Sequence, residues 1–303
     1  MICLAFISCF DNGLHAQQSA RKVSIDVTKV LGGQHICIVG NGSVQFINEN
    51  ELVLLAGPDS NCYMSVQALQ LVVITRDGRV LTQKSWPSTY PFVVLSADRI
   101  AISGNGDITI LNDALKAVQT VSLPKAQHSS VSLQKEAPDT LLARLPRGEV
   151  LAYSGLPLVQ TSQQETKQGD QVVYLRRNRE MLILRKQELL KITPSGDSRQ
   201  LANLTWLHDC NKLCQAWSSG TTWAVSEDGN RAVFTSSGTR FPVTDESGLF
   251  PFFRLLVVDL ATGKELYRKE FDTKTSGRSA QLSPTGDSLL INDGDQLHFQ
   301  PVN

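Results

Sequence analysis

The sequence predicts an all-β protein, a β-propeller of six blades with four antiparallel strands in each. Three observations predict this fold. A polar turn followed by a short apolar strand recurs along the chain, the copies lie 41 to 57 residues apart, and no convincing helix separates them. Units of about 40 to 50 residues with four short strands are typical of propeller blades. Seven blades are the alternative, which requires dividing the long segment 206–271, where "TDESGLFPF" instead resembles an inserted loop.

The first element of each unit is an apolar strand after a polar turn, as in "SEDGNRAVFTSSGT" from Ser226 and "LSPTGDSLLINDGD" from Leu282. A strand that is covered on both faces by neighbouring blades is expected to be continuously apolar, whereas an outer strand that faces solvent alternates. The six apolar strands are centred on Val53, Ile100, Leu141, Leu182, Ala232 and Leu289.

The second element is an apolar strand, a short turn and a more polar strand. It is clearest in "LLVVDLATGKELYRKEF" (255–271), and "LVVITRDGRVLTQKSW" from Leu71 repeats it. Segment 178–192, "NREMLILRKQELLKI", is rich in helix-forming residues. Its apolar residues Met181 to Leu184 are consecutive rather than spaced at helical intervals, so we predict strand there.

The last unit contains "SLLIND" and "DQLHFQPV" but lacks one strand of a blade. The segment "RKVSIDV" (21–27) is available to complete it. Joining the two ends of the chain in one blade would remove exposed sheet edges, which otherwise invite aggregation. No blade can bury its faces alone, so we expect stability to require the closed ring.

These turns and strands resemble known repeats. "SEDGNRAVFTS" and "SPTGDSLLIND" resemble the S-P-D-G element of WD-like repeats in exported bacterial propellers, and "LLVVDLATGKELYRKEF" is similar to the YVTN-type element. The resemblance is good for about three blades, and the Trp-Asp and Gly-His dipeptides of strict WD repeats are missing. It implies a propeller fold and no particular activity, because propellers serve as scaffolds, receptors, lectins and enzymes.

Composition limits the class of partner. The 303 residues are 41% hydrophobic and 19% charged, enough to bury a large core. Twenty-nine basic residues balance twenty-nine acidic ones without a long block of either sign. Nucleic-acid binders and binders of anionic membranes normally carry basic clusters, so we expect neither activity, and no insertion into a membrane.

The N-terminus predicts export. An apolar stretch, "MICLAFISCF", precedes a polar one with an Ala16–Gln17 cleavage site. We therefore predict a signal peptide at 1–16, a single propeller domain at 17–303, and a secreted or periplasmic protein. The apolar stretch lacks a preceding Lys or Arg, and a frayed leader without an export role is the alternative.

Four cysteines remain after the leader: Cys37, Cys62, Cys210 and Cys214. An even number in an exported chain indicates disulfides, and we favour Cys37–Cys62 and Cys210–Cys214 among the three possible pairings. A zinc site is the alternative, because "HDCNKLC" places His208 near two thiols. Structural zinc sites usually pair two such motifs, and the sequence has no second one.

Signals for catalysis are weak. "SGNGDIT" (103–109) is followed by a strand rather than a helix, so Gly104-Asn105-Gly106-Asp107 is predicted to be a hairpin turn and not a phosphate loop. The histidines outside the leader (His35, His128, His208 and His298) are scattered over different units, and no Gly-x-Ser-x-Gly elbow occurs. The four tryptophans do not recur at blade spacing and are expected to fill gaps between blades.

The segment "SGLFPFFRLL" (247–256) is the most apolar outside the repeats. Phe250, Phe252 and Phe253 are candidates for an exposed loop that binds a partner at one rim of the ring. The alternative is that these rings fold back over a neighbouring blade.

The sequence therefore predicts a monomeric, non-enzymatic module that binds a protein or a small molecule, without a cofactor. The alternative is an enzyme of the six-bladed lactonase class with Ca²⁺ in the central channel. Such a site needs several converging oxygen ligands, and the sequence does not reveal which residues line the channel.

Overall fold

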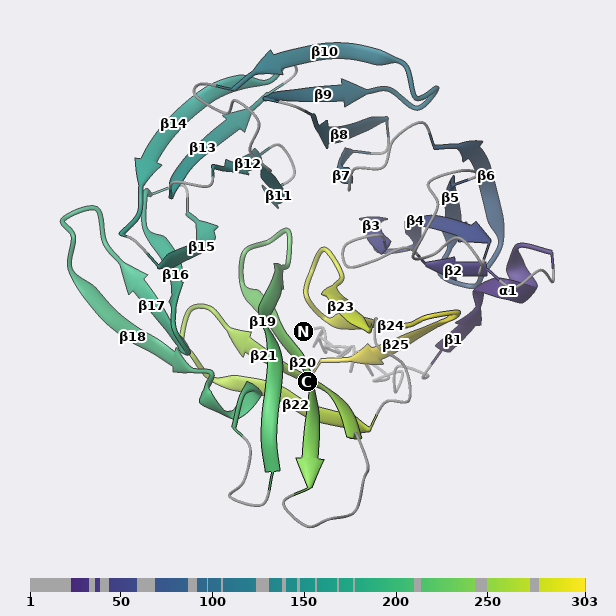
Figure 1. Ribbon diagram of the computed structural model, residues 1–303. Helices are drawn as coiled ribbons and strands as arrows, with labels where there is room; N and C mark the ends of the chain where they lie inside the picture. The colour runs from purple at the N-terminus through teal and green to yellow at the C-terminus, as the bar shows by residue number, and fades with distance from the viewer. Residues whose placement is uncertain are drawn as a thin grey trace, which may run out of the picture.

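The strands form six separate sheets around a central axis, so the chain is a six-bladed propeller (Figure 1). This is a computed structural model of the chain. It describes residues 23–302 apart from 33–35, 39–43, 59–68, 87–91, 97, 105, 124–130, 138–139, 146–147, 156, 168, 177, 210–213, 243–249 and 273–277.

Each blade is a meander, and its strands are counted outward from the axis; in blade 1 the first strand in this sense is the one at Val44–Asn48 (Figure 1). Blade 1 contains β2 (Ile36–Ile38), β3 (Val44–Asn48), β4 (Glu51–Pro58), β5 (Gln70–Thr75) and β6 (Val80–Ser85), with β2 and β3 both paired to β4. Blade 2 contains β7 (Phe92–Ser96), β8 (Arg99–Ser103), β9 (Asp107–Leu111) and β10 (Ala117–Ser122). Blade 3 contains β11 (Ser132–Ala137), β12 (Thr140–Arg144), β13 (Glu149–Ser154) and β14 (Val159–Glu165).

The second half of the ring follows the same plan. Blade 4 contains β15 (Asp170–Leu175), β16 (Met181–Arg185), β17 (Glu188–Ile192) and β18 (Ser198–Asn203). Blade 5 contains β19 (Cys214–Val225), β20 (Arg231–Pro242), β21 (Phe250–Asp259) and β22 (Glu265–Asp272). Blade 6 contains β23 (Ser279–Leu282), β24 (Ser288–Asp293), β25 (Gln296–Pro301) and β1 (Val23–Asp26).

The six predicted apolar strands are confirmed, and all of them are second strands of blades. Their centres lie in β4, β8, β12, β16, β20 and β24. The segment 178–192 contains two strands, β16 and β17, as predicted, and Lys186, with a positive φ of 56°, lies in the turn that joins them. Two short helical turns occur in the described residues, α1 (Val27–Val30) and the 3₁₀ turn η2 (Thr205–Leu207).

The apolar core is divided into six clusters, and each cluster lies between two adjacent blades. Strand β12 shows why its sequence is continuously apolar. Leu141 and Ala143 pack toward blade 2, whereas Leu142 packs toward blade 4. Because each interface needs both neighbours, a blade has no core of its own, and burial depends on the complete ring.

The two ends of the described chain meet in blade 6. Strand β1 pairs antiparallel with β25, and Ser24 lies opposite His298. The Ser24 hydroxyl and His298 Nδ1 are 2.8 Å apart. Leu297 and Phe299 are buried on one face of β25. Because side chains alternate along a strand, His298 lies on the opposite face from them. The ring is thus closed by the N-terminal strand.

The turn between β21 and β22, Asp259–Lys264, is held by one side chain. Asp259 Oδ1 accepts hydrogen bonds from the Ala261 and Thr262 backbone N–H groups and from the Thr262 hydroxyl. These donors lower the pKa of Asp259. Gly263 has a φ of +78° and lies against the backbone of Leu201 in blade 4, where a Cβ would overlap the Leu201 carbonyl oxygen. The glycine is required by its conformation and by the close approach of two blades.

Replacing Gly263 with alanine should therefore be strongly destabilising. We expect Gly263→Ala to lower the free energy of unfolding by about 3 kcal/mol or more, from left-handed strain plus displacement of the blade 4 backbone. Gly196→Ala is the matched control, because Gly196 has a φ of +89° and no atom lies within 4 Å of the position that its Cβ would take. It should lose only about 1 kcal/mol. Equal losses in urea denaturation would show that the contact between blades is unimportant.

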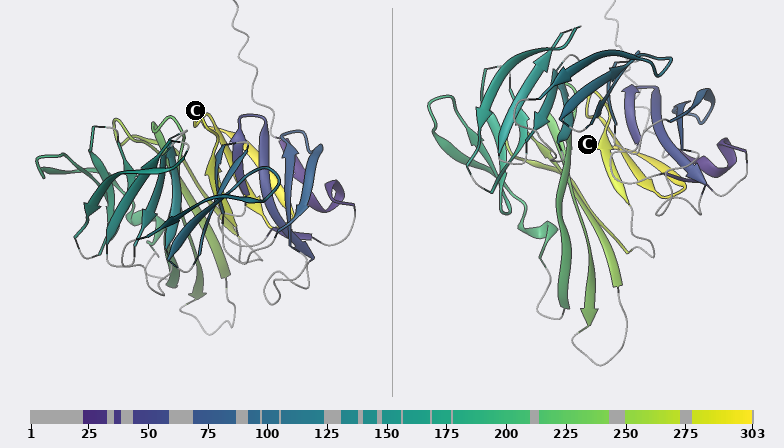
Figure 2. Two further views of the ribbon diagram at one scale, coloured as in Figure 1. Left: turned by 90° about the horizontal axis from the view of Figure 1, so that it is seen from above. Right: turned by 45° about the horizontal axis from the view of Figure 1, so that its top comes forward.

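Blade 5 is larger than the others. Strands β19, β20 and β21 have 12, 12 and 10 residues, and they project beyond the ring (Figure 2). This extension corrects one prediction. Phe250, Phe252 and Phe253 lie in strand β21 rather than in a loop, and Phe252 and Phe253 are each only 2% exposed. Phe253 packs on Phe271 of β22, with ring centroids 6.1 Å apart.

Candidate functional site: the axial channel

A cavity of about 480 Å³ occupies the axis of the ring. It is lined by the first strands of blades 1, 2, 3, 5 and 6 and by the turns that follow two of them. Ligand-binding pockets commonly have volumes of about 300 to 1,000 Å³. The position and the volume make this channel the candidate site.

The walls combine aromatic and aliphatic side chains with a few amides. Phe46, Phe92 and Trp223 line the cavity together with Val94 and Leu282. The nonpolar wall provides a surface on which a ligand can be desolvated, and the fixed polar groups can then set its orientation.

Glutamine side chains satisfy the backbone edges that the first strands would otherwise leave unpaired. The Gln45 amide donates to the Phe92 carbonyl oxygen at 2.5 Å and accepts from the Val94 N–H at 2.9 Å. Gln134 donates to the Val173 carbonyl oxygen at 3.0 Å. These bonds join blade 1 to blade 2 and blade 3 to blade 4, so they make the channel wall rigid.

One ion pair lies among the channel residues. Lys135 on β11 donates from its ammonium to the Glu227 carboxylate, and both residues line the cavity. Lys135 belongs to blade 3 and Glu227 to blade 5, so the pair bypasses blade 4. It places one positive and one negative group side by side in the channel.

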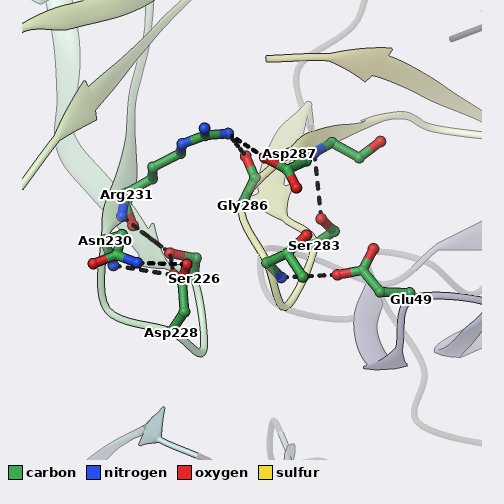
Figure 3. Close-up of polar contacts among 10 residues, drawn as sticks. Glu49, Ser226, Asp228, Asn230, Arg231, Ser283, Gly286 and Asp287 are labelled. Atoms are coloured by element: carbon green, nitrogen blue, oxygen red, sulfur yellow. Dashed lines mark hydrogen bonds and ion pairs between the residues drawn. The ribbon is translucent and has the colours of Figure 1, made fainter. Parts of the chain in front are cut away.

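Glu227 lies in the turn between β19 and β20, and Figure 3 shows the hydrogen bonds of its neighbours Ser226 and Asp228 in that turn. The Ser226 hydroxyl donates to Asp228 at 2.6 Å, and the Arg231 N–H donates to the Ser226 hydroxyl at 3.0 Å. Arg231 also donates to the Gly286 carbonyl oxygen at 2.8 Å and pairs with Asp287 at 2.9 Å. Because these bonds attach the turn to blade 6, the backbone that carries Glu227 has little freedom.

The same face of the ring continues this network to blade 1. The Thr285 N–H donates to Glu49 at 2.8 Å, which links the turn of blade 6 to the turn between β3 and β4 (Figure 3). The turns at 226–229 and 283–286, which resemble the S-P-D-G element, therefore hold neighbouring blades together on this face.

Lys135 is positioned by the residues on either side of it. Gln134 is bonded to β15, as described, and the Glu136 carboxyl accepts from the Leu175 N–H at 2.9 and 2.8 Å. Successive side chains of a strand point to opposite faces, so the two anchors direct Lys135 away from blade 4.

Glu136 and Arg144 form a buried group behind the channel wall. Glu136 is 2% exposed, and burial raises its pKa to about 8, although the Leu175 N–H and the charge of Arg144 lower it. Burial lowers the pKa of Arg144 to about 10, while the charge of Glu136 raises it. Arg144 donates to the Gln134 side chain and lies 4.9 Å from the centre of the Trp223 ring.

The predicted disulfides lie outside what the structure describes. Cys62 and Cys210 are in undescribed segments, and only the backbone of Cys37 in β2 and Cys214 in β19 is described. His208, the third residue of the alternative zinc site, has its Nε2 2.6 Å from the Thr221 hydroxyl. Burial and then the charge of Arg254 lower the pKa of His208. Both the disulfides and the zinc alternative remain predictions.

The described channel residues do not fit a calcium ion. Calcium requires about six to eight oxygen ligands, several of them carboxylates. Within the described part of the chain, no three His, Cys, Asp or Glu side chains are grouped so that they could hold a metal ion. Glu227 is the carboxylate that lines the described cavity, and it is paired with Lys135.

No helix in the described ranges has the length and hydropathy needed to cross a bilayer.

Comparisons with known proteins give likenesses to solved structures and no match by sequence. No protein-family model and no curated protein match the sequence. Among solved structures, the chain is similar to Kluyveromyces lactis Hsv2, with 10% identity, a TM-score of 0.46, and 88% of this chain and 75% of that chain covered. It is also similar to the Neurospora crassa Pan2 WD40 domain, with 11% identity, a TM-score of 0.46, and 87% and 89% covered.

Proposed function

We propose that the protein is a non-enzymatic binding module that holds its ligand, or an inserted segment of a partner protein, in the axial channel. The observation that carries this proposal is the cavity of about 480 Å³ that combines aromatic walls with a positioned Lys135–Glu227 pair. Fixed polar groups that converge beside nonpolar walls are the usual form of a ligand site.

The state of the ionisable groups favours binding over catalysis. General acid–base catalysis needs a group that can exchange a proton with the substrate. In the described part of the channel, Lys135 and Glu227 neutralise each other, while Glu136 is buried behind the wall against Leu175. These groups are arranged to recognise charge rather than to transfer protons.

Photo-crosslinking tests the proposal. Ser132 is exposed and lines the channel, whereas Val159 is 60% exposed on the outer strand β14. A benzophenone amino acid at position 132 should yield a defined adduct when the protein is expressed in its source cell. The same group at position 159 should not yield that adduct. Adducts from position 159 alone would place the ligand on the rim and contradict the proposal.

A calcium titration tests the lactonase alternative. We expect the melting temperature to be the same with calcium and with a chelator, because the described channel lacks the ligands for calcium. An ion at a hundred times its Kd would add about 2.7 kcal/mol to stability. A rise of several degrees with calcium that the chelator reverses would support the enzyme instead.

We further propose export, with cleavage after Ala16 and two disulfides, on the basis of the apolar N-terminus and the four remaining cysteines. Intact mass should show a chain that begins at Gln17. The unreduced mature protein should then take up no alkylating agent, and the reduced protein should take up four equivalents. Four alkylated cysteines without reductant would contradict the disulfides.

A further inference from the structure

We infer that the channel ligand is a small zwitterion with a nonpolar body, such as a free amino acid or a short peptide. This inference rests on the proposed function and assigns its ligand class. It follows from the Lys135–Glu227 pair, from the walls around the pair and from the charge balance of the cavity.

The two charges of the Lys135–Glu227 pair restrict the charge of the ligand. The two side chains are 13% and 25% exposed, so both are largely removed from water. A ligand with a single charge can replace one partner only by leaving the other buried without a counter-ion, and this is strongly unfavourable. A ligand that carries both charges can separate the pair and give each side chain a new partner. The cavity then remains neutral, which favours a zwitterion over an anion or a cation.

The two side chains of the pair differ in how far they can move. The turn fixes the backbone of Glu227, and its short side chain leaves the carboxylate little reach, whereas Lys135 reaches the carboxylate through four methylene groups. The lysine can therefore move while the glutamate stays in place. We expect a ligand ammonium to take the place of the lysine on Glu227, and the ligand carboxylate to be held by the displaced Lys135.

The walls of the cavity restrict the uncharged part of the ligand. Phe46, Phe92 and Trp223 line the same cavity, and aromatic rings bind nonpolar or aromatic groups well. Gln281 also lines the cavity and can bond a polar atom of the ligand. The volume of about 480 Å³ leaves room for a side chain beyond the charged end.

Calorimetric titration of the full chain with three related probes tests this inference. L-Phenylalanine carries both charges, 3-phenylpropionate lacks the ammonium, and 2-phenylethylamine lacks the carboxylate. We expect the Kd for phenylalanine to be at least about tenfold lower than for either other probe. The inference is overturned if a singly charged probe binds as tightly, or if no probe binds.

Two channel variants test the site itself. Lys135→Met/Glu227→Gln keeps the shape of the pair and removes both charges, so it should weaken phenylalanine binding at least about tenfold. Lys135→Glu/Glu227→Lys restores an ion pair and should bind the zwitterion better than the neutral variant does. If the neutral variant binds phenylalanine like the wild type, the pair is not the binding site and the inference is wrong.

A second ion pair supplies the matched control. Lys191 and Glu180 of blade 4 are 2.7 Å apart, are 21% and 14% exposed, and do not line the channel. Lys191→Met/Glu180→Gln should leave phenylalanine affinity unchanged. The crosslinking experiment separates the two levels of the argument. An adduct at position 132 without binding of any probe would overturn the zwitterion and leave the binding module, whereas the absence of both would overturn the proposed function.

Discussion

Arg254→Met is expected to lower the free energy of unfolding by about 3 kcal/mol, because it removes a buried guanidinium that pairs with one carboxylate and donates to two backbone carbonyl oxygens. Arg254 is 6% exposed on β21. Its guanidinium pairs with Glu270 at 2.7 Å, donates to the Trp206 carbonyl oxygen at 2.6 Å and also donates to the Asp209 carbonyl oxygen. The arginine thus attaches the η2 segment to the extension of blade 5.

Arg268→Met is the matched control for this loss. Arg254 and Arg268 both lie over the Trp206 ring, at 5.2 and 4.8 Å, but the Arg268 side chain is 44% exposed and its ion pair with Glu265 is on the surface. Exposed pairs contribute about 1 kcal/mol or less, so we expect a loss in that range. Both variants are compared by urea denaturation. Similar losses would mean that the stacking on Trp206, rather than the buried hydrogen bonds, holds the segment.

Glu136 should make the stability of the protein fall as the pH rises from about 5 to about 8. Burial raises the pKa of Glu136 from its ordinary value of 4.5 to about 8. The folded state therefore binds a proton that the unfolded state releases within this window. The stabilisation is complete below the unfolded pKa and is lost as the pH passes the folded pKa. Its size is of the order of a few kcal/mol.

Glu136→Gln should remove this dependence on pH. The amide oxygen of glutamine can still accept the hydrogen bond from Leu175, and it does not titrate. Glu165→Gln, on the exposed face of β14 in the same blade, should leave the slope unchanged. The measurement is the free energy of unfolding at several pH values from about 5 to about 8.5. A slope that persists in Glu136→Gln would assign the titration to another group.

The blades were predictable because their signal is a consequence of burial. Second strands such as β12 are covered on both faces, so their apolar residues run without interruption and mark each unit. The strand assignment of 178–192 was correct for the same reason, since tertiary packing outweighed the helix propensity of its residues.

The phenylalanine loop was wrong because the length of a strand depends on its partners. The apolar run from Leu255 marks the part of β21 inside the ring, but β20 and β22 extend the pairing back to Phe252 and further. A sequence window gives no indication of that extension, so Phe252 and Phe253 were assigned to a loop.

The channel pair had no detectable sequence signal. Lys135 is one of two charged residues in the polar strand β11, and Glu227 is the second residue of the turn at 226–229. They meet only because the ring brings blade 3 and blade 5 together across blade 4. The turn itself was recognised, and it is the turn that fixes Glu227.

The channel exists only if the ring is closed, and closure depends on the pairing of β1 with β25. Hydrogen–deuterium exchange of the intact protein tests this most directly. The account predicts that backbone amides of residues 23–26 that bond to β25 exchange as slowly as those of β24. If residues 23–26 exchange within seconds while the other blades stay protected, the N-terminal strand does not close the ring.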